Sequence, residues 1–277
     1  MKKLAAIGLI LMGLFWLLPA YFTVQTSFMS KFTSPLNLWG HAHLENWRTL
    51  PWNTLGGWAF NSLIVCAIAG CLTPVVCISA GYAFVRYEFP GKEQIFYAFL
   101  LAIAMPGIVL FLPRYLLVAK VGLTGSYAGL ILPVIMSPAL VFLSRQYLSH
   151  IDISIIEAAR LDGASELRIF RSIVLPLSIP LVVLGVITGF GASYGDFMWQ
   201  YLVGREIKTL TVGIGIFILS TAESAATGGG EILRGHTGIS YESLKAATSV
   251  LQSLPPLILF IVGQKYFIKG LNIGTPE

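Results

Sequence analysis

Long uncharged stretches dominate the pattern of hydrophobic and polar positions along the 277-residue chain. Six of them approach or exceed the roughly 18 to 20 residues that cross the hydrocarbon core of a bilayer as a helix. They comprise residues 4–24, 59–85, 95–113, 121–144, 172–195 and 246–264. A seventh, residues 209–222, is shorter and interrupted by glycines, which favours an interfacial or re-entrant segment. The pattern predicts an all-α integral membrane protein with about six transmembrane helices.

Composition supports a bilayer as the main solvent. Hydrophobic residues make up 56% of the chain and charged residues 11%, against roughly 45–50% and 25% in soluble domains. The first stretch follows Lys2 and Lys3, as in a signal peptide, but no small-x-small cleavage site follows it, so we expect a retained helix. The net charge of +5 comes from basic residues that lie between the hydrophobic stretches, where lipid headgroups account for them. No nucleic-acid partner is therefore expected.

The distribution of basic residues predicts the orientation in the cytoplasmic (inner) membrane. With both termini cytoplasmic, the inner segments hold ten of the eighteen basic residues, and they flank both the first and the last stretch. The chain is then one multi-pass transmembrane domain, residues 1–277. Its most charged loop, residues 145–171, is cytoplasmic, and the loop of residues 205–245 lies outside. The glycine-rich piece Thr227–Gly230 in that outer loop is either a contact for an extracytoplasmic partner or, more simply, a linker.

The cytoplasmic loop carries the pattern of two short amphipathic helices, which Asp162 and Gly163 separate. Periodicity alone fits equally an interfacial loop whose apolar face dips into lipid headgroups. The spacing goes further, because Glu157-Ala158-Ala159, three residues, Gly163 and nine residues precede Ile-x-Leu-Pro at 173–176. This spacing resembles the signature loop of ATP-binding-cassette (ABC) importer permeases.

In that family the loop is a coupling helix, located between the fourth and fifth transmembrane helices, that docks in a cleft of the ATPase subunit. The resemblance therefore assigns ATPase coupling to Glu157, Ala158, Ala159, Leu161, Asp162 and Gly163. Physically, the two alanines permit close approach to a partner and Gly163 permits a sharp turn. Glu157 either fixes the shape of the loop, meets a basic partner residue, or is a solvated surface carboxylate.

Further segments resemble the maltose-type sugar permeases, among them 60–63, 82–92, 121–124, 194–199, 209–213 and 264–271. Two positions depart from that group: Asp152 stands where proline is frequent, and residues 222–236 form a longer outer segment. The resemblance implies one half of a translocation path for a carbohydrate. It also implies a second homologous permease subunit, two ABC ATPase subunits, an extracytoplasmic solute-binding protein and membrane lipid as partners.

Enzymatic motifs are missing from the sequence. The only Gly-Lys pair, Gly91-Lys92, is followed by Glu93 and has Arg86 at the position where a phosphate-binding loop needs glycine. We therefore expect no catalytic residue and no cofactor in this chain, with ATP and Mg²⁺ acting on the partner subunits. The three cysteines lie five and six residues apart in one stretch and match no metal site, so apolar packing is their expected role.

Asp196, Trp199 and Gln200 are candidates for the substrate path, because an acid within a bilayer is costly unless it is paired or wet. Trp199 also fits an interfacial anchor. Gly185-x-x-x-Gly189 indicates close helix packing, most simply within the subunit.

The alternative functions are a self-sufficient secondary transporter or channel, which usually shows intramembrane charges and internal symmetry, and a membrane scaffold. Co-purification with an ATPase separates these from an importer permease.

The orientation is testable by labelling from each side of the membrane. After replacement of the native Cys66, Cys71 and Cys77, a single cysteine at position 228 should react with an impermeant reagent added outside, and one at position 154 only from the cytoplasm. Reaction at position 228 from the cytoplasm alone would reverse the arrangement and the placement of the charged loop.

Overall fold

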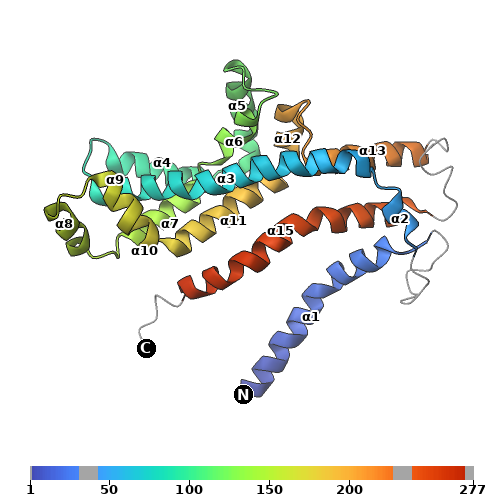
Figure 1. Ribbon diagram of the computed structural model, residues 1–277, viewed down its shortest axis with the longest axis horizontal. Helices are drawn as coiled ribbons and strands as arrows, with labels where there is room; N and C mark the ends of the chain where they lie inside the picture. The colour runs from blue at the N-terminus through green and yellow to red at the C-terminus, as the bar shows by residue number, and fades with distance from the viewer. Residues whose placement is uncertain (1, 31–42, 227–238, 272–277) are drawn as a thin grey trace. The chain divides into compact units, whose positions relative to one another are not determined.

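The structure is a computed structural model that describes residues 2–30, 43–226 and 239–271. Within these ranges the chain is helical and contains no β-strand, as predicted (Figure 1). The elements are α1 (Lys2–Ser27), α2 (Glu45–Arg48), α3 (Trp52–Arg86), α4 (Lys92–Ala104), α5 (Gly107–Lys120), α6 (Tyr127–Ile131), a 3₁₀ turn η1 (Leu132–Val134), α7 (Pro138–Leu148), α8 (Ile153–Leu161), α9 (Glu166–Ile169), a π-helical turn η2 (Phe170–Val174), α10 (Leu175–Leu177), α11 (Ile179–Gly195), α12 (Phe197–Gly204), α13 (Leu210–Ala226) and α15 (Tyr241–Leu271).

The chain forms two compact parts, each built from two separate segments. The first comprises residues 1–56 and 210–255, and the second comprises residues 57–209 and 256–277. In the first part, the buried Asn46 donates hydrogen bonds from its side-chain amide to the carbonyl oxygens of Ser27 (2.9 Å) and Met29 (2.8 Å), so α2 fixes the chain that leaves α1. Residues 227–238, including the predicted linker Thr227–Gly230, lie outside the described residues.

Helices of sufficient length and apolarity give three spans, and six, the predicted number, when each of three bent pairs is counted as one span. Three are continuous: Ala6–Ser27, Trp52–Arg86 and Tyr241–Gln264. The other three are bent pairs, with angles of 113° between α4 and α5, 47° between the segments Tyr127–Val134 and Pro138–Leu148, and 84° between Glu166–Leu177 and Ile179–Gly195. The stretch 209–222, predicted to be interfacial or re-entrant, lies in the shorter helix α13 except for Thr209, which precedes it.

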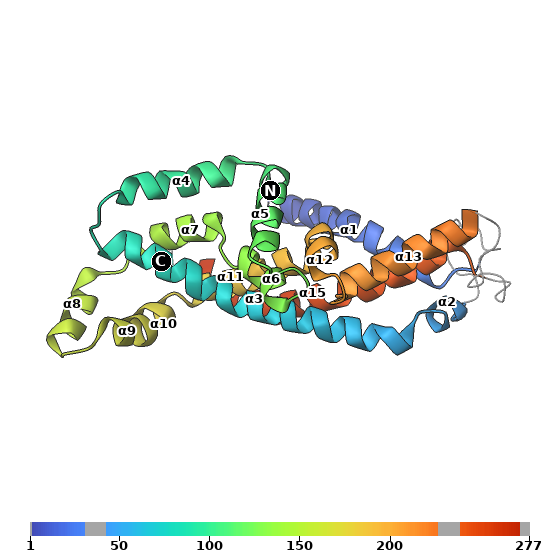
Figure 2. The ribbon, with the colours of Figure 1, turned by 90° about the horizontal axis from the view of Figure 1, so that it is seen from above.

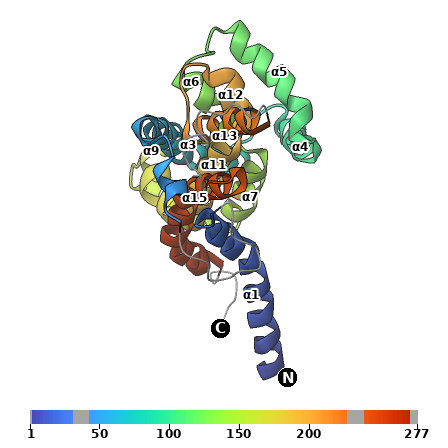
Figure 3. The same cartoon turned by 90° about the vertical axis from the view of Figure 1, so that its right-hand side faces the viewer.

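Proline explains why the expected stretch 95–113 is not one straight helix. Met105 is extended (φ −78°, ψ 129°) and precedes Pro106, after which α5 leaves in a different direction (Figures 2 and 3). A residue before proline is pushed out of the helical region, and proline donates no backbone hydrogen bond. Ser137 is likewise extended before Pro138, and its side chain accepts a hydrogen bond from the backbone N–H of Leu140.

Two glycines of α11 allow close packing against α3. A Cβ atom at Gly185 would lie 2.6 Å from the Cβ of Pro74, and one at Gly189 would lie 2.5 Å from the Oγ1 of Thr73 and 2.9 Å from the carbonyl oxygen of Ala69. Such distances leave no room for any side chain. The predicted use of the Gly185-x-x-x-Gly189 pattern, helix packing within the subunit, is therefore confirmed.

The packing makes a matched pair of substitutions informative. Gly189→Ala should destabilise the protein by about 1–3 kcal/mol, because the added methyl group overpacks the α3 contact. Gly191→Ala, two residues away with no atom within 4 Å of the new Cβ, should be neutral or slightly stabilising. Thermal denaturation midpoints of the purified variants in detergent measure both effects. Equal midpoints for the two variants would contradict the close contact.

Candidate functional site

The segment with the permease-like spacing forms a short helix-turn-helix between α7 and α9. Helix α8 lies at one end of the second part, beyond the ends of α3 and α7 (Figures 1 and 2). Asp152 caps α8, since its carboxylate accepts a hydrogen bond of 2.9 Å from the backbone N–H of Ser154. This bond to the ionised form lowers the pKa of Asp152. The residue that departs from the sugar-permease pattern thus gives α8 its start.

Gly163 ends α8 in a left-handed turn. Its φ angle is +76°, its N–H donates to the carbonyl oxygen of Arg160, and the N–H of Ala164 donates to the carbonyl oxygen of Ala159, both at 3.0 Å. These two bonds form a Schellman motif, in which glycine avoids the Cβ penalty of the left-handed region. Because a Cβ here would meet no atom within 4 Å, the requirement for glycine is conformational and not spatial.

Polar contacts attach this helix-turn-helix to its surroundings. Glu166 accepts hydrogen bonds of 2.7 Å from the Nε of Arg160 and from the hydroxyl of Tyr87. The Glu166 bond raises the pKa of Tyr87 to about 12. The guanidinium of Arg86 donates to the carbonyl oxygen of Ile151 at 2.8 Å, just before α8 begins. The end of α3 therefore holds both the entry to α8 and the turn that follows it.

The helix-turn-helix has an apolar inner face. Ile156 and Ile169 are buried in one cluster with Ile78 and Tyr82 of α3, and Ala159 packs against the same cluster. Of the six residues assigned to coupling, Ala159 is thus the half-buried one that serves the packing of its own chain. The other five, Glu157, Ala158, Leu161, Asp162 and Gly163, are exposed.

The outer face of this segment is unusually apolar for an exposed surface. The side chain of Leu161 is 90% exposed and that of Leu167 66%, in the same short segment as the exposed Ile153 and Ile155. Among the described residues, no hydrogen bond or ion pair involves the side chain of Glu157. Exposed apolar side chains arranged in this way are typical of a surface that another molecule covers.

Asp196 occupies the break between α11 and α12. Its carboxylate caps α12 by accepting a 3.0 Å hydrogen bond from the backbone N–H of Trp199. It also pairs with the guanidinium of Arg114 on α5, at 3.1 Å, and Arg114 lies over the indole ring of Trp199, 4.0 Å from its centroid. Both charged side chains are about 30% exposed, so this ion pair stays partly accessible at the break between α11 and α12.

The two other residues predicted for the path have different surroundings. Trp199 is 1% exposed and lies in a core cluster of α3, α5, α6 and α12. Gln200 is 2% exposed; its amide donates to the carbonyl oxygen of Ser193 and accepts from the hydroxyl of Thr209. The structure therefore places Asp196 at an accessible position and the other two residues inside the subunit.

Sequence reasoning missed Arg114, which it counted only as a basic residue of an outer segment. The signal that it overlooked is that an acid within the membrane requires a cationic partner. A second polar contact was also missed: the hydroxyl of Tyr127 donates to Asn61 at 2.7 Å, and Asn61 donates to the carbonyl oxygen of Lys208 at 2.9 Å.

Cysteine and acidic side chains do not assemble into a metal site. No group of three or more His, Cys, Asp or Glu residues suited to a metal ion occurs within residues 2–30, 43–226 and 239–271. Cys66 and Cys77 are buried as predicted, whereas Cys71 is exposed, so the prediction of apolar packing is wrong for that residue.

Known proteins provide an independent comparison. Residues 74–230 match the family described as binding-protein-dependent transport system inner membrane component. The arabinooligosaccharides transport system permease protein AraQ of Bacillus subtilis is 34% identical over 217 residues, which cover 78% of this chain and 72% of that protein. The sn-glycerol-3-phosphate transport system permease protein UgpE of Brucella suis is 28% identical over 266 residues, covering 91% and 89%.

A solved structure supports the fold. One chain of a bacterial ABC transporter involved in the import of the acidic polysaccharide alginate matches with a TM-score of 0.73 and 21% identity, covering 96% of this chain and 97% of that one. The family match covers more than half of the chain and includes the whole helix-turn-helix around α8. The chain therefore belongs to the inner membrane components of binding-protein-dependent transport systems, as a permease subunit of an ABC importer.

Proposed function

We propose that this permease forms half of a translocation path for a carbohydrate and that α8 transmits the movements of an ATPase subunit to it. The observation that carries the coupling role is the geometry of α8: a capped helix, closed by the Gly163 turn, anchored on its inner face and bare on its outer face. A docking element needs this combination, because it must transmit force to its own chain and bind another.

The outer face fits a groove on a partner. Exposed Leu161 supplies an apolar anchor at the tip of α8, and Ala158 leaves space for close approach. Glu157 and Asp162 add two carboxylates beside it, suited to basic residues of the partner. In this proposal Ala159 positions α8 from within and does not touch the ATPase.

The proposed assembly contains this chain, a second homologous permease, two ATPase subunits and an extracytoplasmic binding protein. ATP and Mg²⁺ act on the ATPase subunits, and this chain binds no cofactor of its own. A carbohydrate as substrate is supported by the relative named for arabinooligosaccharide transport. Both termini and α8 are cytoplasmic in this proposal, in agreement with the distribution of basic residues.

We also propose that Asp196 lines or approaches the path, with Trp199 and Gln200 fixing its position from behind. The ion pair of Asp196 with Arg114 lies at the break between α11 and α12. Such a pair is less costly at a hydrated surface than in lipid. The same ion pair is the one observation that favours a self-sufficient secondary transporter, since such proteins place charges at helix breaks. Dependence of transport on an ATPase separates the two functions.

Gly163 provides the test of coupling. Gly163→Val should disrupt the turn, because a β-branched residue is strained at φ +76°, and should reduce substrate-stimulated ATPase activity of the assembled importer by at least about tenfold. Gly163→Asn is the matched control, because asparagine tolerates the left-handed region, and should retain most of the activity. Normal coupling in the valine variant, with unchanged membrane insertion, would argue against docking through α8.

Asp196 provides the test of the path. Asp196→Asn preserves a cap for α12 but removes the charge that pairs with Arg114, and it should change transport or substrate-stimulated ATPase activity about threefold or more without reducing the amount of complex. Asp196→Ala removes the cap as well and should also lower thermal stability by about 1 kcal/mol. If transport kinetics are normal in both variants, the role of Asp196 is structural.

A further inference from the structure

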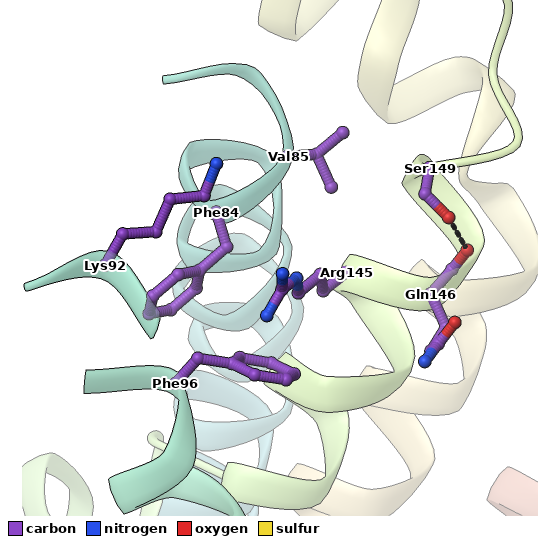
Figure 4. A pocket seen from close by; sticks show the side chains of 7 residues that line it. All are labelled: Phe84, Val85, Lys92, Phe96, Arg145, Gln146 and Ser149. Atoms are coloured by element: carbon purple, nitrogen blue, oxygen red, sulfur yellow. Dashed lines mark hydrogen bonds between the residues drawn. The ribbon is translucent and has the colours of Figure 1, made fainter. Parts of the chain in front are cut away.

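We propose that a pocket between α3, α4 and α7 binds the phosphate headgroup of an anionic phospholipid. Figure 4 shows the side chains that line the pocket. Its volume is about 470 Å³. Its lining includes Phe84 from the end of α3, Lys92 and Phe96 from the start of α4, and Arg145, Gln146 and Ser149 from the end of α7. The cavity thus combines two cations, two further polar groups and two aromatic rings.

Lys92 lines the pocket with a side chain that is largely buried. Its side chain is 12% exposed, whereas that of Glu88, which it contacts at 2.8 Å, is 89% exposed. An ammonium group has three donors, and the bond to Glu88 uses one of them. The other two donors can bind a further acceptor inside the pocket, and a phosphate oxygen is suited to this position because the hydrogen bond is charge-assisted.

Arg145 presents the second cation. Its guanidinium carbon lies 3.9 Å from the centroid of the Phe96 ring, and its two terminal nitrogens contact Glu93 at 2.8 and 3.3 Å. The side chain of Glu93 is 51% exposed, against 24% for Arg145. Both cations therefore line the cavity, and each is less exposed than the carboxylate it pairs with. The bidentate contact with Glu93 uses two of the five N–H donors of Arg145, which leaves three for a phosphate.

The apolar surroundings favour a lipid over a free phosphate ion. Phe84 and Phe96 form one wall of the pocket, and α4 continues from it with the exposed apolar side chains of Ile95, Tyr97 and Leu101. An acyl chain can follow this surface while the headgroup stays with Lys92 and Arg145. Gln146 and Ser149 are suited to the ester and hydroxyl oxygens of the glycerol moiety.

The position of the pocket along the membrane normal is also consistent with a lipid headgroup. In the orientation of the proposed function, on which this inference rests, the ends of α3 and α7 and the start of α4 lie at the cytoplasmic surface, where anionic lipids meet basic pockets between helices. The headgroup would contact Arg145 and Ser149 just before Asp152 begins α8. A lipid bound there would steady the base of the helix that we propose to dock on the ATPase.

Binding can be measured on the full-length chain, purified in detergent with the subunits that accompany it. Phosphatidylglycerol or phosphatidylcholine with the same acyl chains is added, and retained lipid is quantified by native mass spectrometry. Phosphatidylglycerol should be retained at least about tenfold better. Lys92→Gln should lower its retention about tenfold, because a charge-assisted hydrogen bond is lost, and Lys92→Arg should preserve it.

The matched control is Lys120→Gln, which makes the same change of charge at an exposed residue at the end of α5 and should leave retention unchanged. Equal retention of the two lipids, or undiminished retention by the Lys92→Gln variant, overturns the proposal. Displacement of the lipid by millimolar inorganic phosphate identifies a free-ion site and also overturns it. Since this measurement needs neither ATP nor transport, failure of the coupling proposal leaves it intact, and cysteine labelling tests the orientation separately.

Discussion

The close contact between α3 and α11 is the constraint on which the rest of the second part depends. Two helices approach this closely only where one of them lacks side chains, and Gly185 and Gly189 meet that condition against Pro74 and Thr73. Ile78 of α3 and Leu181 of α11 share a core cluster with Ile156 of α8. A second cluster joins Val65 and Ala69 of α3 to Trp199 of α12. Loss of the contact would therefore disturb the α8 segment and the Arg114–Asp196 pair together.

Breaks in the helices recur around this rigid pair. In a bilayer each interruption leaves backbone groups that only the protein can satisfy, and here side chains do so: Ser126 caps α6, Ser137 caps α7 and Asp196 caps α12. The breaks are thus local structures with defined partners. They allow polar side chains such as Asp196 to reach positions that a continuous helix would turn toward lipid or bury.

Hydropathy was sufficient to predict the all-α class and the apolar segments that make up to six spans, because both depend on composition over about 20 residues. It could not predict the break at Met105–Pro106, because the sum over a window does not depend on backbone direction. Proline was visible in the sequence, but Pro19 and Pro74 lie inside continuous helices, so the residue alone does not decide whether a helix breaks.

For the candidate sites, too, the sequence predicted local features and missed those that depend on contacts with distant residues. Spacing located the helix-turn-helix and its glycine, since those depend on local backbone conformation. It did not show that Ala159 turns inward, because that depends on the position of Ile78 and Tyr82 far away in the sequence. The acid at Asp196 indicated the need for a cationic partner, but Arg114 is 82 positions away, so the sequence did not identify it. The burial of Trp199 likewise depends on contacts with α3, α5 and α6.

Helix α11 has a further consequence through its length. Seventeen residues extend about 25 Å; the segment that follows α8 enters at one end, and Asp196 terminates the other. Because Gly185 and Gly189 both lie in the middle of the helix, their contacts with α3 fix the centre of α11 and leave its two ends free to tilt about this point, as about a pivot. A tilt of about 10° around this pivot would move each end by roughly 2 Å in opposite directions, so α11 has the mechanical character of a lever.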